Sequence, residues 1–245
     1  MKITSVNNEL VKDTAKLLRG KYREETGLFL IEGEKAVKEA IESGIVIVNI
    51  FKLEGYNEIN YDNCIETTES VLNKISDAKS APKVVAVAKQ LNYSKEQFCN
   101  YKRVVLLEGI KDAGNLGTIL RTAAAFGVDG VVLYGETVDL YNPKCVRSAV
   151  GNLWKIPVIE IKDFSDLQEL FGGYERIATL PRTNNYLKTF DAKLPCVVMF
   201  GSEADGLSEE LVNFSTNSVK IEMASTVESL NLSVSCAVVL YKLFV

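Results

Sequence analysis

Histidine is absent from all 245 residues of this chain. The side chain most often used for general acid–base catalysis is therefore excluded, so arginine, carboxylate, amide and hydroxyl groups must carry any reaction. The five cysteines, at positions 64, 99, 145, 196 and 236, are odd in number and contain no Cys-x-x-Cys pair. This spacing argues against a disulfide framework or a zinc site, and favours buried, reduced thiols in a cytoplasmic protein.

Long apolar runs are also lacking, because charged residues interrupt every hydrophobic stretch. No segment is long enough to span a bilayer, and the first nine residues lack the apolar core of a signal peptide. We therefore expect a cytoplasmic protein with no membrane partner. The hydrophobic fraction of 47% excludes a disordered chain and predicts a well-buried core.

An excess of positive charge is missing too, since the formal net charge is −4. Residues 1–23 nevertheless carry six basic and two acidic side chains, a local charge of +4, so the other 222 residues sum to −8. This basic N-terminus fits two interpretations equally: a surface that grips a phosphate backbone, or a solvated helix face.

The hydrophobic pattern alternates between short strands and helices throughout the chain. In the first 90 residues it predicts strands over 28–31, 45–51 and 84–88, with helices over 6–20, 33–43 and 68–76. These elements indicate a small α/β unit. Residues 91–102 are polar and aperiodic, and are interpreted as a linker.

The second part begins with a strand over 104–107 and ends with an apolar helix over 229–244. Its repeated strand–helix order implies a mostly parallel sheet that is covered on both faces. The other predicted strands are 131–134, 158–161, 177–180 and 197–200, and the other predicted helices are 115–126, one beginning at 142–143, 165–171 and 208–213.

Three segments place glycines and small polar residues near strand ends: residues 112–123, 200–208 and 221–233. Ligands bind at this edge of an open α/β sheet. The first segment lacks both the Gly-Lys-Ser/Thr ending of a triphosphatase loop and the Gly-x-Gly-x-x-Gly spacing of a dinucleotide fold. Those two enzyme classes are therefore disfavoured.

Each polar residue in these segments has a structural interpretation beside the functional one. Asn115 and Ser229 stand where a helix N-cap belongs. Arg121 is either a surface arginine or a group that faces a bound anion across the turn from Gly117. Glu203 either binds a cation or hydroxyl group or precedes a helix whose dipole favours acidic residues.

Taken in order, the three segments resemble the motifs of the SpoU ribose methyltransferases, members of the SPOUT superfamily. The resemblance covers residues 104–245. Glu32-Gly33-Glu34 and Ala81-Pro82 also resemble that family's N-terminal RNA-binding module. The matching patterns are Asn115-x-Gly117-x-x-x-Arg121, Gly201-Ser-Glu203-x-x-Gly206 and Ile221-x-Met223 followed by Ser229-Leu-Asn231-x-Ser233.

The resemblance implies an α/β protein with an RNA substrate-binding domain over residues 1–95 and a SPOUT methyltransferase domain over 102–245. The latter would have a mostly parallel sheet and a deep trefoil knot. It also implies a homodimer, with the active site near the subunit interface, that transfers a methyl group from S-adenosylmethionine to a ribose 2′-OH of RNA. Ribosomal RNA is favoured over tRNA because family members with the N-terminal module mostly act there.

The same resemblance assigns roles to individual residues and requires no metal. Arg121 would activate the 2′-OH, either as a base or as a cation that stabilises the developing alkoxide. Asn115, Glu203, Ser229 and Asn231 would orient Arg121, the ribose or a neighbouring phosphate. The cofactor would contact Thr179, Leu180, Gly201, Ile221, Met223 and Leu230.

Two positions depart from the family pattern: Ala113 and Glu222 stand where proline is frequent. Glu222 adds a charge and a backbone N–H beside the expected cofactor loop. Three rival classes stay open: a tRNA 2′-O-methyltransferase, a non-catalytic RNA-binding member of the family, and a base-methylating SPOUT enzyme.

Overall fold

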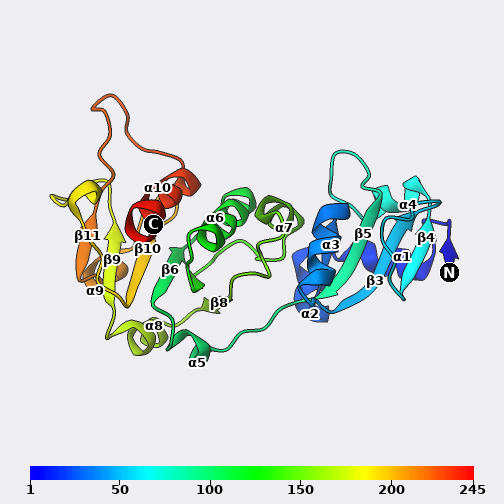
Figure 1. Cartoon of the computed structure of the whole chain (residues 1–245), viewed down its shortest axis with the longest axis horizontal. Coiled ribbons are helices and arrows are strands. Elements are labelled where there is room, and N and C mark those ends of the chain that lie inside the picture. The colour runs from blue at the N-terminus through cyan, green and yellow to red at the C-terminus, as the bar shows by residue number, and fades with distance from the viewer. The chain divides into compact units, whose positions relative to one another are not determined.

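The computed structural model describes residues 1–245 as two compact units (Figure 1). The first unit contains Met1–Leu91 together with Asp139–Lys155, and the second contains Asn92–Val138 together with Ile156–Val245. The segment 139–155 belongs to the second half of the sequence but packs within the first unit. A single boundary near residue 100 therefore does not separate the two compact units. The functional domains expected over residues 1–95 and 102–245 stay a prediction.

A five-stranded mixed sheet forms the centre of the first unit, in the order β1-β4-β3-β5-β2. Strand β5 runs antiparallel to both of its neighbours, whereas the β1–β4 and β4–β3 pairs are parallel. Sequence patterning missed the two short strands β1 and β4, which are neighbours at one side of this sheet. The strands are β1 (Lys2–Ile3), β2 (Leu28–Glu32), β3 (Ile47–Leu53), β4 (Cys64–Thr67) and β5 (Val84–Lys89).

The predicted helix over residues 6–20 is present but shorter, since α1 covers Glu9–Lys16 and a second, unpredicted helix begins at Gly20. After α1 the N–H groups of Leu17, Leu18 and Arg19 each donate to the carbonyl three residues earlier, as in a 3₁₀ turn. Helix α2 then begins at Gly20. Gly27, with φ +64°, ends that helix in a left-handed conformation that glycine adopts readily. The helices of this unit are α1 (Glu9–Lys16), α2 (Gly20–Thr26), α3 (Glu34–Glu42), α4 (Glu69–Lys74) and α7 (Pro143–Ala149).

The basic N-terminus is largely neutralised by local partners. Lys12 and Lys16 each pair at 2.8 Å with an acidic residue three positions earlier. Arg23 is buried, and its Nε donates to Asp139 at 2.7 Å. These contacts favour the structural interpretation of the positive charge over the phosphate-binding one.

A six-stranded sheet forms the second unit, in the order β11-β9-β10-β6-β7-β8, and every strand pair is parallel. Three neighbouring strands near the centre of this sheet contain continuous apolar runs, and Val104, Val132 and Val197 within them are all fully buried. The predicted mostly parallel sheet is confirmed. The strands are β6 (Arg103–Glu108), β7 (Gly130–Tyr134), β8 (Val158–Ile161), β9 (Glu175–Thr179), β10 (Cys196–Phe200) and β11 (Asn217–Val219).

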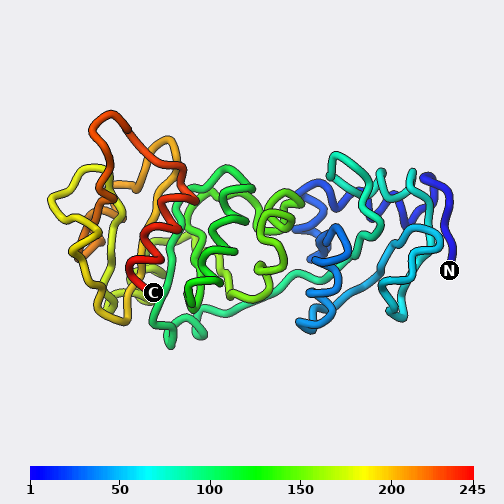
Figure 2. Tube along the Cα trace, turned by 45° about the horizontal axis from the view of Figure 1, so that its top comes forward, coloured from blue at the N-terminus to red at the C-terminus, as the bar shows by residue number.

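Helices α6 and α10 pack against each other in the second unit (Figures 1 and 2). A short helix, α5, lies within the segment interpreted as a linker, and Ser94 and Gln97 form a capping box at its start. The helices are α5 (Lys95–Phe98), α6 (Ala113–Ala125), α8 (Phe164–Phe171), the 3₁₀ helix η1 (Leu187–Thr189), α9 (Glu209–Phe214) and α10 (Leu232–Phe244). None of the helices in the chain is long and apolar enough to cross a membrane.

All five cysteines are free thiols. Cys145 and Cys196 are buried, and burial raises the pKa of each thiol to about 12. Cys99 is exposed, so the expectation of uniformly buried thiols is wrong at this position.

Candidate functional site

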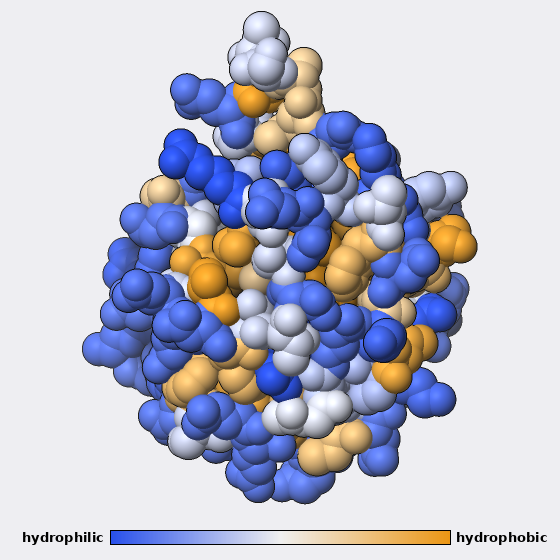
Figure 3. Space-filling view, turned by 90° about the vertical axis from the view of Figure 1, so that its left-hand side faces the viewer, coloured by the Kyte–Doolittle hydropathy of each residue, from blue (hydrophilic) through white to orange (hydrophobic).

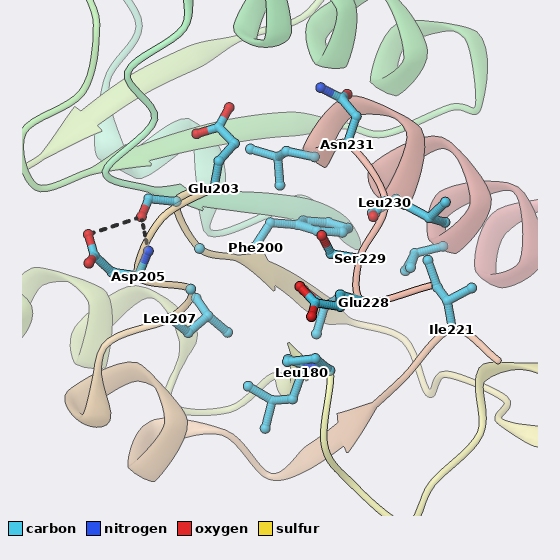
Figure 4. Close-up of a pocket in the computed structure, with 18 of the residues that line it drawn as sticks. Leu180, Phe200, Glu203, Asp205, Leu207, Ile221, Glu228, Ser229, Leu230 and Asn231 are labelled. Carbon is cyan, nitrogen blue, oxygen red and sulfur yellow. Dashed lines mark hydrogen bonds between the residues drawn. The ribbon is translucent and has the colours of Figure 1, made fainter. Parts of the chain in front are cut away.

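A cavity of about 670 Å³ opens at the carboxyl ends of β9, β10 and β11 (Figure 4). Because the three strands are parallel neighbours, the segments that follow Thr179, Phe200 and Val219 emerge at one edge of the sheet. The long segment between β11 and α10, which stands out from the second unit in Figure 2, supplies the remaining wall. The volume lies within the range of about 300–1,000 Å³ found for small-molecule sites.

A tight turn after β10 builds one side of this cavity. Ser202 and Gly206 exchange backbone hydrogen bonds of 3.2 and 3.1 Å, and Gly206 has φ +72°. A Cβ atom on Gly201 would lie 1.9 Å from the Gly206 carbonyl carbon, so only glycine permits this approach. The Ser202 Oγ accepts from the Asp205 N–H at 3.0 Å, which fixes the turn and leaves Glu203 and Asp205 exposed on it (Figure 4).

All six residues predicted to contact the cofactor line this cavity: Thr179, Leu180, Gly201, Ile221, Met223 and Leu230. Three of the five predicted catalytic residues, Glu203, Ser229 and Asn231, line it as well. Glu203 and Asn231 lie on one rim in Figure 4, and Leu180 and Leu207 lie on the opposite side.

Sequence reasoning missed several lining residues, among them Pro181, Phe200, Leu207, Val219 and Glu228. All except Val219 directly adjoin a residue that the sequence analysis named, so proximity in sequence could have found them. Leu207, for example, comes directly after Gly206 in the second motif, but it is apolar and so gave no polar signal of its own.

The three sequence segments meet in one hydrogen-bond chain. The Asn115 Nδ2 donates to Glu203 Oε1 at 2.5 Å, and the Asn231 Nδ2 donates to Asn115 Oδ1 at 3.2 Å. The Asn231 Oδ1 accepts from the Ser233 N–H at 2.9 Å at the start of α10. Asn115 does not line the cavity itself, but it holds two residues that do.

The N-cap interpretations of Asn115 and Ser229 are wrong. Helix α6 begins two residues before Asn115, and its N-cap is Asp112, whose Oδ1 accepts from the Asn115 N–H at 2.8 Å. Helix α10 is capped by Asn231. The side chain of Asn115 is therefore free to bridge Glu203 and Asn231, and Ser229 lies in the cavity wall before the helix.

Arg121 lies on α6 with its side chain exposed and without a hydrogen bond or ion pair. It does not line the cavity of its own chain. Helical periodicity places Arg121 on the same face as Gly114 and Gly117, away from Asn115. The structure thus joins four of the five predicted catalytic residues and leaves Arg121 apart.

The cavity combines an apolar surface with carboxylates. Leu180, Ile221 and Leu230 offer apolar contact, whereas Glu203 and Glu228 bring negative charge to the same space. This arrangement suits a small organic ligand that has an apolar body and a positive centre.

Glu222, one of the two departures from the family pattern, faces away from this lining. Its carboxylate pairs with Lys188 Nζ at 2.5 Å, and Glu222 is not a lining residue. Its charge is therefore directed to the segment after β9 rather than into the cavity.

Comparison with known proteins agrees with this geometry. The profile of the SpoU rRNA Methylase family matches residues 102–241, and that of the MRM3-like substrate binding domain matches residues 8–86. An uncharacterized tRNA/rRNA methyltransferase of Synechocystis is 32% identical over 98% of this chain and 92% of its own. The 23S rRNA (guanosine(2553)-2′-O)-methyltransferase RlmP of Bacillus subtilis is 31% identical over 98% of both chains.

A solved structure shares the whole architecture. The crystal structure of an AdoMet-bound rRNA methyltransferase from Sinorhizobium meliloti superposes with a TM-score of 0.88 at 29% identity, covering 99% of this chain and 96% of that one. The profile match extends over more than half of the chain, and the relatives align along nearly its full length. The chain belongs to the SpoU rRNA methylase family.

Proposed function

We propose that this protein is an S-adenosylmethionine-dependent methyltransferase that modifies a ribose 2′-OH of ribosomal RNA. The observation that carries the proposal is the hydrogen-bond chain Glu203–Asn115–Asn231 beside the cavity. It unites the three family motifs at the sheet edge where ligands bind. The names of the Bacillus subtilis and Sinorhizobium meliloti relatives support rRNA as the substrate.

The residues of the cavity fit the proposed cofactor. Leu180, Ile221 and Leu230 supply apolar surface for an adenosyl group, and the close turn at Gly201 brings backbone groups to the cavity wall. Glu203 and Glu228 supply negative charge for a sulfonium centre. When bound, S-adenosylmethionine supplies an electrophilic methyl group.

The chain's own residues then have to position a ribose hydroxyl and take up or stabilise its charge. Asn115 fixes Glu203 and Asn231 relative to each other, so the rim of the cavity presents a preorganised carboxylate and amide. Arg121, a permanent cation, stabilises the developing alkoxide electrostatically. Ser229 on the cavity wall contacts the ribose or its phosphate.

We infer that the working enzyme is a homodimer. Helix α10 and the residue that follows it expose an apolar stripe, with Val234 48%, Val238 40%, Tyr241 60% and Val245 77% accessible. Their spacing of three and four residues places them on one helix face. Arg121 lies on the adjacent helix α6 and outside the cavity of its own chain, so an interface along these helices would bring it to the partner's site.

Three further features belong to this proposal: a deep trefoil knot within residues 102–245, RNA binding by the N-terminal domain, and a cytoplasmic location. The family membership supports the first, and the MRM3-like match over residues 8–86 supports the second. The third follows from a ribosomal RNA substrate.

The test is methyl transfer from radiolabelled S-adenosylmethionine to ribosomal RNA from cells that lack the gene, followed by nucleoside analysis. We expect a labelled 2′-O-methylnucleoside. A base-methylated nucleoside, or label found in tRNA alone, would replace the proposed substrate. Cofactor and RNA binding without any transfer would indicate a non-catalytic member of the family.

A further inference from the structure

A second cavity adjoins the one described above and differs from it in charge. It is lined by Pro181, Arg182, Thr183, Asn184 and Lys220. Pro181 also lines the first cavity, so the two are neighbours in the same unit. Every polar side chain in the second lining can donate a hydrogen bond, and none is a carboxylate.

The two cations of this cavity lack acidic partners, unlike the cations around them. Lys188 pairs with Glu222 at 2.5 Å, and Lys242 pairs with Asp191 at 3.2 Å. Neither Arg182 nor Lys220 has an ion-pair partner. Two unpaired positive charges facing one polar cavity favour an oxyanion as its occupant.

Backbone hydrogen bonds hold this cavity in shape. The Lys220 N–H donates to Asn185 O at 3.0 Å, and the Leu187 N–H donates to Lys220 O at 2.9 Å, so the loop after β9 extends the sheet beyond β11. The hydroxyls of Thr183 and Ser218 lie 2.7 Å apart across the same pair. The backbone that carries the donors, and the Thr183 hydroxyl, are thus positioned before any ligand binds.

Tyr186 orients the lysine of the cavity. The Lys220 Nζ lies 4.6 Å from the centre of the Tyr186 ring, within the range of a cation–π contact. Tyr186 itself is 40% exposed. Figure 3 looks onto this end of the second unit and shows a mostly hydrophilic face with small apolar patches.

We propose that Arg182, Thr183, Asn184 and Lys220 bind a backbone phosphate of the RNA strand that reaches the adjoining cavity. This inference rests on the proposed function. Every nucleotide of an RNA strand carries a phosphate, so a strand with one ribose at the rim of the first cavity brings further oxyanions to the surface around it. A guanidinium and an ammonium ion together recognise phosphate by a forked contact and a point charge.

The carboxylate of the bound cofactor is the other available oxyanion, and the two sources predict different results. The variants are Arg182→Gln and Lys220→Gln, with Lys162→Gln as the matched control, because Lys162 is an exposed lysine of the same unit without an ion-pair partner. Filter binding to ribosomal RNA from cells that lack the gene would be measured over a series of salt concentrations. Calorimetric titration with S-adenosylmethionine would be done on the same samples.

We expect each cavity variant to raise the RNA Kd and the KM for RNA by about three- to tenfold and to lower the salt-dependence slope by about 0.7–1. Cofactor affinity and kcat at saturating RNA should stay within twofold of the parent, and Lys162→Gln should match the parent throughout.

A loss of cofactor affinity with unchanged RNA binding would assign the cavity to the cofactor and overturn the proposal. Unchanged RNA affinity and salt slope in both variants, while the parent methylates RNA, would overturn it and leave the proposed function standing. A parent protein that neither binds nor methylates RNA would overturn both.

Discussion

Replacement of Gly201 by alanine tests how the turn after β10 builds the cavity in which we propose that the cofactor binds. The added Cβ would lie 1.9 Å from the Gly206 carbonyl carbon and 2.1 Å from both the Gly206 oxygen and the Leu207 nitrogen. All three atoms belong to the backbone, so no side-chain rotation relieves the overlap. The two sides of the turn would have to separate by roughly 1.5 Å to reach an ordinary carbon–carbon contact.

Two costs follow from that separation. Overpacking of this kind destabilises a protein by about 1–3 kcal/mol. The paired hydrogen bonds between Ser202 and Gly206, at 3.2 and 3.1 Å, would weaken at a further cost of about 0.5–1.5 kcal/mol each. We expect Gly201→Ala to lower the free energy of unfolding by about 2–6 kcal/mol in total.

The same displacement should reach the cofactor, because residues 201–207 form a continuous part of the cavity lining. A shift of about 1 Å in a binding wall can reduce activity about 100-fold, so cofactor affinity should fall at least tenfold. Urea unfolding and calorimetric titration with S-adenosylmethionine would measure the two effects separately.

Gly173→Ala provides the matched control. Gly173 lies in the same unit, has no positive φ, and a Cβ there would meet no atom within 4 Å. This variant should be neutral or more stable by up to about 1 kcal/mol, since alanine restricts the unfolded chain. If Gly201→Ala unfolded at the same urea concentration as Gly173→Ala and bound the cofactor as the parent does, the close approach of Gly206 could not be what shapes the cavity.

Three further predictions concern the hydrogen-bond chain, the dimer and the alkaline limit of stability. Asn115→Ala should lower kcat at least 100-fold while the free energy of unfolding falls by only about 1–2 kcal/mol, because water can replace bonds at this partly exposed position; an equally small effect on kcat would refute its positioning role. Val238→Glu should shift the protein from dimer to monomer in sedimentation velocity by placing a charge within the exposed stripe of α10, and a variant that sediments as the parent does would disprove that interface. Burial, with the hydrogen bond to Glu210, raises the pKa of Tyr134 to about 12, above its unfolded value of 10.0, so its contribution to stability is complete below pH 10 and is lost as the pH rises toward 12. Tyr134→Phe should therefore lose less stability than the parent across that window in urea titrations, and identical pH profiles would contradict the assignment.

Much of the second unit could be predicted because several of its strands contain short apolar runs, such as those at 104–107, 131–134 and 197–200, separated by glycine and polar segments. Such runs are the pattern of buried parallel strands, and the six-stranded parallel sheet agrees with it. The short strands β1 and β4 of the first unit were missed because two and four residues carry too little periodicity to detect. Helix α2 was missed because its seven residues, Gly20–Thr26, carry no apolar face, and Arg23 is the only one of them that is buried.

The candidate site shows a similar division. The resemblance named six residues for cofactor contact, and all six lie in the lining of one cavity. Local pattern was less able to distinguish capping from binding: Asn115 and Ser229 resembled N-caps, yet Asp112 and Asn231 cap the two helices. Whether such a residue caps a helix or binds a ligand depends on the helix start to within one or two residues. Sequence patterns locate helix ends less accurately than that.

The sequence by itself determined the chemical possibilities of this protein: no histidine, three glycine-rich polar segments at strand ends, and an α/β order that places them at a sheet edge. Only the tertiary structure decided that Asn115, Glu203 and Asn231 form one hydrogen-bond chain, and that residues 139–155 pack with the first unit. It also decided that Arg182 and Lys220, separated by 38 positions, face one cavity without acidic partners. The physical reason is range: composition and periodicity act over a few neighbouring residues, whereas hydrogen bonds and charges act between groups that only strand order and register bring together.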